Sequence, residues 1–349
     1  MGTKVFIAQP RGFCAGVVRA IDAVTASIEK FGAPVYVRKQ LVHNNSVTDA
    51  LSASGAIFVD ELDHLPEGAT VILSAHGVAP EVYEDARRRR LNVIDATCPL
   101  VTKVHLEATR YAREGRPIVI VGHRGHEEVI GTLGYASADA DVVPDIAAVE
   151  RLELPVGAAP AVITQTTLAV DDTRDTIEAI RRRFPAVITP AHDDICYATQ
   201  NRQAAVRELA RSTQVILVIG AANSSNSNRL REVAEAAGVR AYLIADLSEL
   251  RTEWLHGVDS IGVTAGASTP EHLVDEVVSY LRSRYDASVE TIEVTRENVT
   301  FSTPTPVTRF KRSRPQQAAA QESVVRVPAE SKEGAVLTEE GVRDGRRTQ

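Results

Sequence analysis

The sequence predicts an α/β protein built from three quasi-repeated modules whose sheets are mainly parallel. Short runs rich in Val and Ile alternate along the chain with stretches of helical periodicity, and turns of small residues separate them. The three cysteines recur at comparable intervals, and each stands at such a turn. With 349 residues, 44% of them hydrophobic, the chain is long enough for two or three compact units.

Composition excludes several classes of protein. A net charge of −7 and a pI near 5.8 argue against a nucleic-acid binder. The longest apolar runs, such as VILVIG, are too short to span a bilayer. No signal peptide precedes the first strand, and an odd number of cysteines suits a reducing compartment. We therefore expect a cytoplasmic protein with neither a nucleic-acid nor a membrane partner.

The first predicted unit is VFIAQPRGFCAGVVRAIDAV, residues 5–24, in which a strand leads through a glycine-containing turn into a helix. The apolar residues of this helix recur every three or four positions and predict one buried stripe. That stripe consists of Val17, Ile21, Val24, Ile28 and Phe31.

Five later segments repeat the pattern of strand, turn and helix. In chain order they are residues 71–88, 93–108, 117–129, 215–238 and 260–281. Because α/β sheets bind ligands where strands end and helices begin, the turns inside these segments are the candidate functional positions.

The predicted organisation has three modules, a strand segment and a tail. The tail is rich in Pro, Gln, Ser and charge and has few aromatic residues, so we expect it to be disordered and without a catalytic role. The expected bounds are 1–97, 98–195 and 196–285 for the modules, 286–302 for the C-terminal strand segment, and 303–349 for the tail.

The cysteines open predicted helices. Pro99 suits the first position of a helix, which places Cys98 at the N-cap, and the residues around Cys14 and Cys196 suggest the same position. A helix N-terminus favours a thiolate and can donate hydrogen bonds to sulfur. The thiols could be small buried hydrophobic groups, or they could bind three irons of a four-iron cluster and leave the fourth open. A zinc site with paired CxxC spacing is not present.

Histidines and hydroxyl groups occupy other turns. The histidines are His43, His76, His123 and His126, and the polar runs are TQTT at 164–167, NSSNSN at 223–228 and GAST at 266–269. Such residues are commonly structural, but together they would suit the oxygens of a phosphate group. Neither a P-loop nor a GxGxxG fingerprint occurs. Glu127 and Glu128 either open a helix as solvated residues or include one buried proton donor.

These motifs together resemble a known family, the LytB/IspH-type 4-hydroxy-3-methylbut-2-enyl diphosphate reductases. The resemblance extends from about residue 4 to residue 302 and rests on RGFCAGVVRAI, VHN, SAHGV, DATCPLVTKVH, GHRGHEEVIGT, TQTTL, DDICYATQNRQ, NSSNS and GAST, in that order. It implies a fold of three α/β modules around a central iron–sulfur cluster. It also implies two-electron reductive dehydroxylation of the allylic diphosphate to isopentenyl and dimethylallyl diphosphate, the last step of the non-mevalonate isoprenoid pathway.

The resemblance also implies roles for individual residues. One [4Fe–4S] cluster with an open iron would be held by Cys14, Cys98 and Cys196. The substrate would be bound by His43, His76, His126, Thr166, Ser224, Ser225, Asn226 and Ser268. Thr166 and Glu128 would lie near the substrate hydroxyl, with Glu128 supplying protons. Electrons would come from a donor of the ferredoxin or flavodoxin type, and we expect a monomer or a homodimer.

The sequence departs from the family pattern at Glu127, where members commonly have proline, so a second carboxyl stands beside the expected acid. Three other hypotheses stay open at this point. They are a cluster-dependent hydro-lyase that needs no reductant, an iron–sulfur sensor without catalysis, and a zinc protein.

Overall fold

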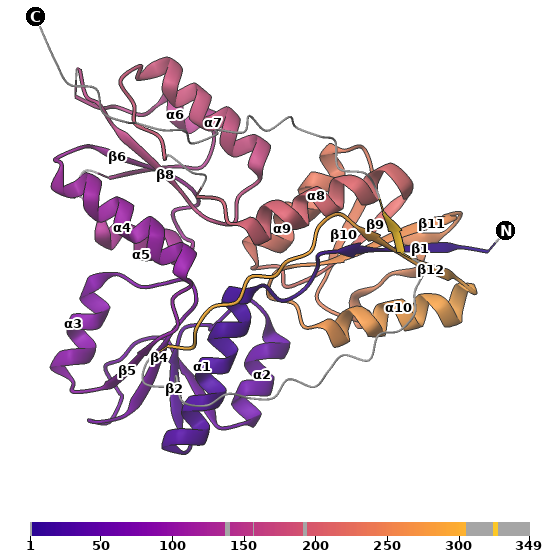
Figure 1. Cartoon of the computed structure of the whole chain (residues 1–349), viewed down its shortest axis with the longest axis horizontal. Helices are drawn as coiled ribbons and strands as arrows, with labels where there is room; N and C mark the ends of the chain where they lie inside the picture. Colours follow the sequence, from indigo (N-terminus) through magenta and orange to yellow (C-terminus); the bar gives the residue numbers. More distant parts are fainter. Residues whose placement is uncertain (1, 137–139, 156, 191–193, 305–323, 327–349) are drawn as a thin grey trace, which may run out of the picture.

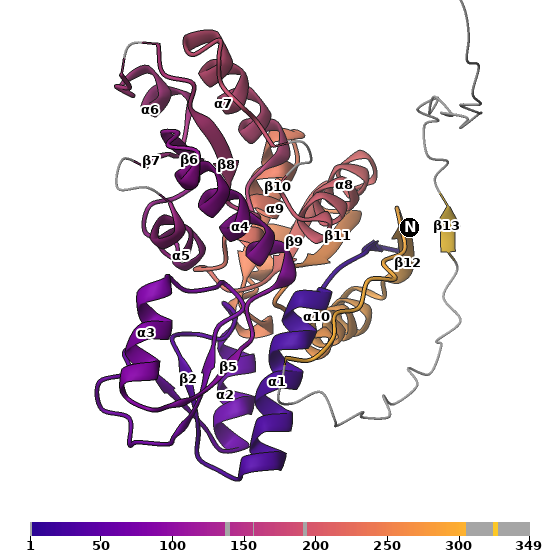
Figure 2. The ribbon, with the colours of Figure 1, turned by 60° about the vertical axis from the view of Figure 1, so that its left-hand side comes forward.

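The computed structural model describes residues 2–136, 140–155, 157–190, 194–304 and 324–326. Its strands form three separate sheets, and the neighbouring strands within each sheet are all parallel. Figures 1 and 2 show the sheets with their helices as three lobes around a common centre. The predicted α/β class with parallel sheets is therefore confirmed.

The first sheet has four strands in the order β3-β2-β4-β5. Its strands are β2 (Val35–Arg38), β3 (Ala56–Val59), β4 (Thr70–Leu73) and β5 (Asn92–Asp95), and its lobe contains α1 (Ala15–Phe31), α2 (Asn45–Ala53) and α3 (Pro80–Arg88). All four residues of β4 are buried, as a strand covered on both faces requires.

The second sheet has the order β7-β6-β8. Its elements are α4 (Pro99–Arg113), β6 (Ile118–Val121), α5 (Glu127–Tyr135), β7 (Asp141–Val143), α6 (Ile146–Glu150), β8 (Ala161–Thr164) and α7 (Val170–Arg183). Its two long apolar strands, β6 and β8, are completely buried.

The third sheet has the order β10-β9-β11-β1-β12-β13. Its elements are β1 (Lys4–Gln9), α8 (Tyr197–Ser212), β9 (Val215–Ile219), α9 (Ser225–Ala236), β10 (Arg240–Ile244), the 3₁₀ turns η1 (Leu247–Glu249) and η2 (Thr252–Leu255), β11 (Ser260–Ala265), α10 (Glu271–Tyr285), β12 (Ser288–Glu293) and β13 (Val324–Arg326). No helix in the described part of the chain has the length and apolar character needed to cross a membrane.

The N-terminal strand does not join the sheet of the module to which its sequence position would assign it. β1 pairs with β11 and β12, in the middle of the third sheet, while α1 packs in the core of the first lobe. The expected first module, residues 1–97, is therefore wrong for its first strand, which belongs to the third sheet. The other expected bounds stay a prediction.

Two further expectations need correction. The stripe of α1 predicts a buried Phe31, but this residue is 40% exposed and is the last residue of the helix. Val324–Arg326 form β13 beside β12, so this part of the expected disordered tail is a strand. Residues 305–323 and 327–349, for which disorder is predicted, lie outside the described residues.

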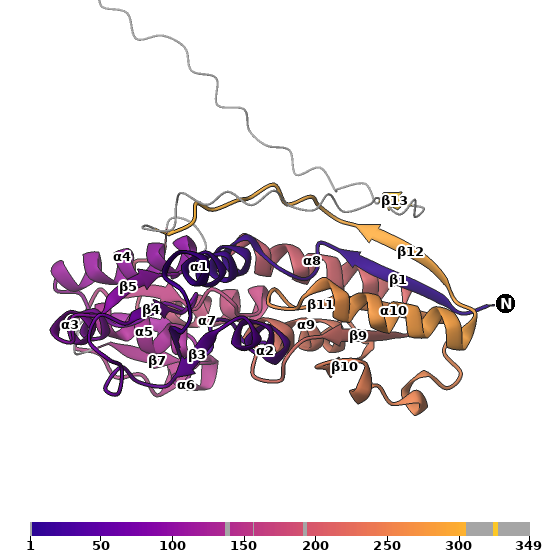
Figure 3. The same cartoon turned by 90° about the horizontal axis from the view of Figure 1, so that it is seen from below.

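After β12 the chain returns to the centre of the molecule without regular structure. Figure 3 shows this segment passing over α8 and α1. Glu297 contacts Arg202 of α8, and the carbonyl of Ser302 accepts a hydrogen bond from Arg19 of α1. The end of the described core thus lies against two of the lobes.

Candidate functional site

Each cysteine is the N-cap residue of a helix, as the sequence predicted. Cys14 precedes α1, Cys98 precedes α4 and Cys196 precedes α8, and no cysteine side chain makes a capping hydrogen bond. Their backbone N–H groups donate to carbonyls of other turns, namely those of Ala267 at 3.1 Å, Ala75 at 3.0 Å and Thr166 at 3.1 Å. Each thiol is therefore fixed at its backbone while its sulfur stays available.

One central cavity collects the predicted residues. Its empty volume is about 690 Å³, open mouth included, which falls in the range of small-molecule sites. The lining includes every predicted site residue: Cys14, Cys98, Cys196, His43, His76, His126, Glu128, Thr166, Ser224, Ser225, Asn226 and Ser268. His123 is not part of this lining. The three lobes therefore contribute side chains to a single site.

Gly16 shows how closely the sulfurs approach one another. A Cβ atom added at Gly16 would lie 2.8 Å from Sγ of Cys98 and 3.8 Å from Sγ of Cys14. A side chain at this position would therefore displace the thiol of Cys98, and only glycine leaves this space open.

Burial controls the protonation of two thiols. It raises the pKa of Cys98 to about 12 and the pKa of Cys196 to about 11, although backbone N–H groups in the first helical turns oppose the shift. The backbone N–H groups of the helix starts therefore favour the thiolates of Cys98 and Cys196, as expected, but burial outweighs this effect. A bound cation would supply the missing stabilisation, since metal binding releases the protons of its cysteine ligands.

Within the described residues, no group of three or more His, Cys, Asp and Glu side chains is arranged to hold a single metal ion. In a mononuclear zinc site the sulfurs surround one atom and lie about 3.8 Å apart. Thiols that each bind a different metal atom of a cluster do not have to meet that condition. The three thiols can therefore line one cavity without being arranged around a single metal ion.

Three histidines form a cluster on the cavity wall. The rings of His43 and His76 stack with centroids 4.2 Å apart, and His126 meets them edge-on at 5.4 and 5.8 Å. Burial lowers the pKa of all three, that of His126 to about 4, and for His76 and His126 the neighbouring imidazoles lower it further. These rings are therefore neutral at pH 7 and can each donate one N–H.

Two ring nitrogens of this cluster are open to a ligand. Nε2 of His43 and Nδ1 of His76 are buried without a hydrogen-bond partner in the described structure. Buried polar atoms are normally paired, so unpaired ring nitrogens in the lining of a cavity indicate a site for a polar ligand. Nδ1 of His43 lies 3.2 Å from Oε1 of Gln40 and donates to it, so Nε2 of this neutral ring is an acceptor, whereas Nδ1 of His76 has no such constraint and can donate to a phosphate oxygen.

Glu128 is the buried carboxyl of the cavity. It is 3% exposed, and its two oxygens accept hydrogen bonds from the backbone N–H of Thr166 at 2.6 Å and from its hydroxyl at 2.9 Å. Burial raises the pKa of Glu128 to about 7, against the opposing effect of these hydrogen bonds. Glu127 instead lines a neighbouring hollow with Lys39 and Asn223. Of the two adjacent carboxyls, Glu128 is therefore the one that faces the central cavity.

The raised pKa makes stability depend on pH. The carboxyl of Glu128 titrates near 4.5 when unfolded and near 7 when folded, so the native state binds more protons between these values. The free energy of unfolding must therefore fall as pH rises through about 7. Glu128→Gln should remove this fall, which urea unfolding of the ligand-free protein at pH 5 and pH 8 would measure.

The comparison between variant and wild type isolates this titration. Asp194, whose pKa burial also raises to about 7, titrates in both proteins, so its own contribution is common to them. Its repulsion of Glu128 is lost in the variant and is one cause of the raised pKa under test. Glutamine has one acceptor oxygen where glutamate has two, so the variant loses one hydrogen bond from Thr166. This loss changes the free energy of unfolding by the same amount at every pH. An equal pH dependence in the two proteins would contradict the raised pKa of Glu128.

The hydroxyl and amide groups come mainly from the start of α9. Ser224 is its N-cap residue, and its side chain accepts from the backbone N–H of Ser227 at 3.3 Å. The unpaired N–H groups and the partial positive charge of a helix N-terminus suit an anion. Ser268 donates to the carbonyl of His43 at 3.0 Å and so connects the third lobe to the first.

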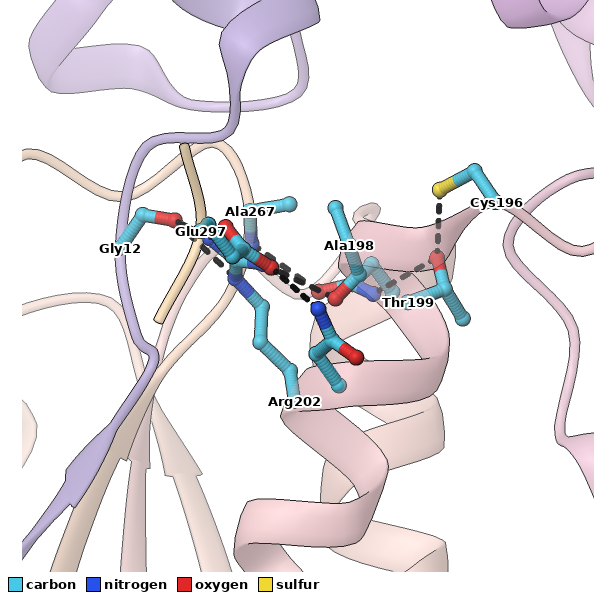
Figure 4. Close-up of polar contacts among 9 residues, drawn as sticks. Gly12, Cys196, Ala198, Thr199, Arg202, Ala267 and Glu297 are labelled. Atoms are coloured by element: carbon cyan, nitrogen blue, oxygen red, sulfur yellow. Dashed lines mark hydrogen bonds and ion pairs between the residues drawn. The ribbon is translucent and has the colours of Figure 1, made fainter. Parts of the chain in front are cut away.

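The side chain of Asn226 is already engaged in the structure. Its Nδ2 donates to Oγ1 of Thr199 at 3.3 Å, and its Oδ1 accepts from the N–H of Ala267 at 3.0 Å. Oγ1 of Thr199 in turn lies 3.2 Å from Sγ of Cys196, as Figure 4 shows. Asn226 therefore connects the turns of Cys14 and Cys196 as well as lining the cavity.

Sequence reasoning missed Thr199 and Thr167, which also line the cavity. Thr199 follows Cys196 by three positions in a helix, a spacing that places two side chains on one face. That spacing was the signal available for Thr199. Thr167 accepts a hydrogen bond from the buried Gln165 at 2.9 Å, and no pattern in the sequence distinguished it within the TQTT run.

The geometry combines three thiols, neutral imidazoles and a protonatable carboxyl in one cavity of an α/β protein, which is the arrangement of an enzyme active site. Residues 5–282 match the family described as LytB protein. The chain belongs to this LytB family.

Similar proteins carry a common name. The chain is 52% identical over 312 residues to the 4-hydroxy-3-methylbut-2-enyl diphosphate reductase of Acidothermus cellulolyticus, covering 89% of this chain and 92% of the relative. It is 54% identical to the protein of that name from Tolumonas auensis, covering 86% and 98% of the two chains. The solved structure of the reductase from Plasmodium falciparum has a TM-score of 0.84 at 34% identity, covering 88% and 97%.

Proposed function

We propose that this chain reduces (E)-4-hydroxy-3-methylbut-2-enyl diphosphate to isopentenyl and dimethylallyl diphosphate with two electrons and two protons, releasing water. The family and the shared name of its relatives support the activity. The observation that carries it is the central cavity, where the cysteines of three lobes meet the imidazole cluster and Glu128. The reaction is the terminal step of the non-mevalonate pathway, as the name of a second solved structure states for its own protein.

The residues fit an iron–sulfur cluster. Cys14, Cys98 and Cys196 would each bind one iron of a [4Fe–4S] cluster, because all three line the cavity and none is used as a helix cap. Gly16 leaves room beside two of the sulfurs. When bound, such a cluster supplies electrons one at a time and a Lewis-acidic iron without a protein ligand.

The polar wall would hold the diphosphate. The neutral rings of His43, His76 and His126 line this wall together with Ser224, Ser225, Asn226 and Ser268. Fixed neutral donors can bind a multiply charged anion through hydrogen bonds, so no charged side chain is needed at the wall beside the cluster. Binding at this wall also orients the C–O bond of the substrate toward the thiols.

Glu128 would supply the proton to the leaving hydroxyl. Hydroxide is a poor leaving group, and protonation during C–O cleavage lowers the barrier. A pKa of about 7 keeps a large fraction of this buried carboxyl protonated at neutral pH. Thr166 would hold the carboxyl in place through its N–H and hydroxyl, and it would contact the substrate hydroxyl.

The remaining parts of the proposal concern the surroundings of the enzyme. A small protein of the ferredoxin or flavodoxin type would deliver the electrons, and the enzyme would act in the cytoplasm as a monomer or a homodimer. A hydro-lyase would turn over without an electron donor, and a sensor would show no change in its cluster when substrate is added.

The deciding experiment is anaerobic purification followed by iron and sulfide analysis, electron-resonance spectroscopy and an assay with reductant. We expect about four irons and four sulfides per chain, a spectrum that changes when the allylic diphosphate is added, and both isomeric products only when reductant is present. A protein that binds zinc alone, or that turns over without a donor, would refute the proposal.

Removal of the tail tests how far the catalytic unit extends. A chain that ends at Ser302 keeps every residue that lines the central cavity and every contact of residues 297–302 with α8 and α1. We expect its kcat/KM to remain within about twofold of the full chain, because the cavity lining is complete and the lost strand β13 lies at the edge of the third sheet. A tenfold loss of kcat/KM would show that the tail takes part in function.

A further inference from the structure

Arg202 lies buried between two of the cysteine turns. It is 0% exposed, and its Nε and Nη2 donate to the carbonyl of Gly12 at 3.1 and 2.8 Å, while Nη1 donates to the carbonyl of Ala198 at 2.9 Å. Gly12 precedes Cys14 by two positions, and Ala198 follows Cys196 by two. As Figure 4 shows, one guanidinium therefore bridges the turn of Cys14 and the helix that Cys196 opens.

Glu297 balances the charge of Arg202. Its Oε1 lies 3.0 Å from Nη1, and its Oε2 lies 3.3 Å from both Nη1 and Nη2. Nδ2 of Asn201 donates to the same carboxylate at 3.0 Å. A planar guanidinium with several bonds fixes orientation as well as distance. A lysine could not make this set of bonds, because an ammonium group is a single point donor.

Arg19 connects a second pair of turns, those of Cys14 and Cys98. It lies on α1, the helix opened by Cys14, and its Nη1 donates to the carbonyl of Thr97 at 3.0 Å, directly before Cys98. Its Nε donates to the carbonyl of Ser302 at 2.8 Å. Residues 297–302, here called the C-terminal strap, thus contact both arginines.

We infer that Arg19, Arg202 and the C-terminal strap fix the mutual positions of the three cysteine turns, which makes the two arginines positioning residues for the proposed cluster. The inference rests on the proposed function. The described strands of the three sheets do not pair across sheets, so sheet hydrogen bonds do not set the distance of the Cys98 turn from the other two turns. The Cys14 turn follows β1 of the third sheet, whose lobe also contains α8, and there Arg202 adds a direct bridge between the Cys14 turn and α8. Arg202 sets the spacing of Cys14 and Cys196, and Arg19 sets that of Cys14 and Cys98.

The strap also covers one side of the Cys14 turn. Glu297, Val299 and Phe301 line a second hollow together with Cys14 and Arg19. Removing the strap would therefore expose the Cys14 turn and also take away the carboxylate that neutralises Arg202. A chain that ends at Thr295 should lose its cluster, whereas a chain that ends at Ser302 should keep it.

The first test measures retention of the cluster by the holoenzyme in the presence of an iron chelator. Loss of contacts behind a metal ligand commonly costs 10- to 100-fold in metal affinity. We expect Arg202→Gln and Arg19→Gln to release iron at least tenfold faster than wild type, and Arg202→Lys to recover only part of the difference. The control is Arg296→Gln, which breaks an exposed ion pair with Glu293 directly before the C-terminal strap. Its rate of iron release should stay within twofold of wild type.

The second test needs no cluster. A short bifunctional thiol reagent is applied to the full chain without metal, and mass spectrometry measures the yield of each cysteine pair. Arg202→Gln should lower the Cys14–Cys196 link and spare Cys14–Cys98, and Arg19→Gln should do the reverse. If Arg202→Gln does not fold because Glu297 is left unpaired, the double variant Arg202→Gln/Glu297→Gln removes both charges and takes its place.

The outcomes separate the inference from the function on which it rests. Variants that unfold at lower temperature but keep wild-type iron release and cross-linking would show a structural role only and would overturn the inference. A wild-type chain without iron and sulfide would refute the proposed function, while its cross-linking pattern would still decide whether the arginines set the spacing.

Discussion

Cys98→Ser should abolish both the bound cluster and the activity. The thiol lies between α4 and the central cavity, and Gly16 leaves space beside its sulfur. A serine oxygen is a harder and less readily deprotonated ligand than a thiolate, so one iron would lose its anchor. We expect iron and sulfide below about a tenth of wild-type content and turnover below detection, as measured by metal analysis and a reductant-dependent assay.

A buried substitution away from the cavity controls for general damage to the fold. Ser27 lies on α1 at 0% exposure and donates to the carbonyl of Ala23. Ser27→Ala should keep the cluster and most of the activity. Full iron content in Cys98→Ser would contradict the assignment of this residue as a ligand.

Glu128→Gln should keep the cluster and the diphosphate site but lose most of the turnover. Glutamine fills the same space beside Thr166 but cannot deliver a proton. General acid catalysis commonly contributes 10²- to 10⁴-fold, and we expect kcat to fall within that range. The substrate-induced change in the electron-resonance spectrum should persist, because binding of the diphosphate depends on other residues.

The pH profile provides a second measure of the same residue. Because the proposed acid is the protonated form of Glu128, wild-type kcat should decline as pH rises above about 7. The residual rate of Glu128→Gln should not show this decline.

Glu127→Gln is the matched control for this variant, since Glu127 lies in the neighbouring hollow. It should retain kcat within a few-fold. A normal rate in Glu128→Gln together with a large loss in Glu127→Gln would reverse the assignment.

The sequence predicted the elements and the composition of the cavity better than it predicted the relations between lobes. Continuous apolar runs such as VILVIG are typical of strands covered on both faces, and this run forms the fully buried strand β9. Cys98 before a proline could be placed at an N-cap from local rules alone. Such features depend on residues close together in the chain, where periodicity and capping preferences apply.

The rest depends on tertiary contacts. The apolar pattern of β1 identifies a buried strand but not its neighbours, so its place between β11 and β12 could not be predicted. The pKa of Cys98 depends on how deeply the lobes bury it, which a local rule about helix N-termini does not include. The contact of Arg202 with Gly12 joins residues far apart in the chain, and nothing local marks it.

The position of β1 has a consequence for how this chain is made. Among the described residues β1 pairs with β11 and β12, near residues 260 and 290, so it leaves the ribosome long before either of these partners. Long-range parallel pairing is slow, and an unpaired apolar strand is prone to aggregate in the meantime. We therefore expect nascent chains to need a chaperone at this strand until synthesis has passed β12.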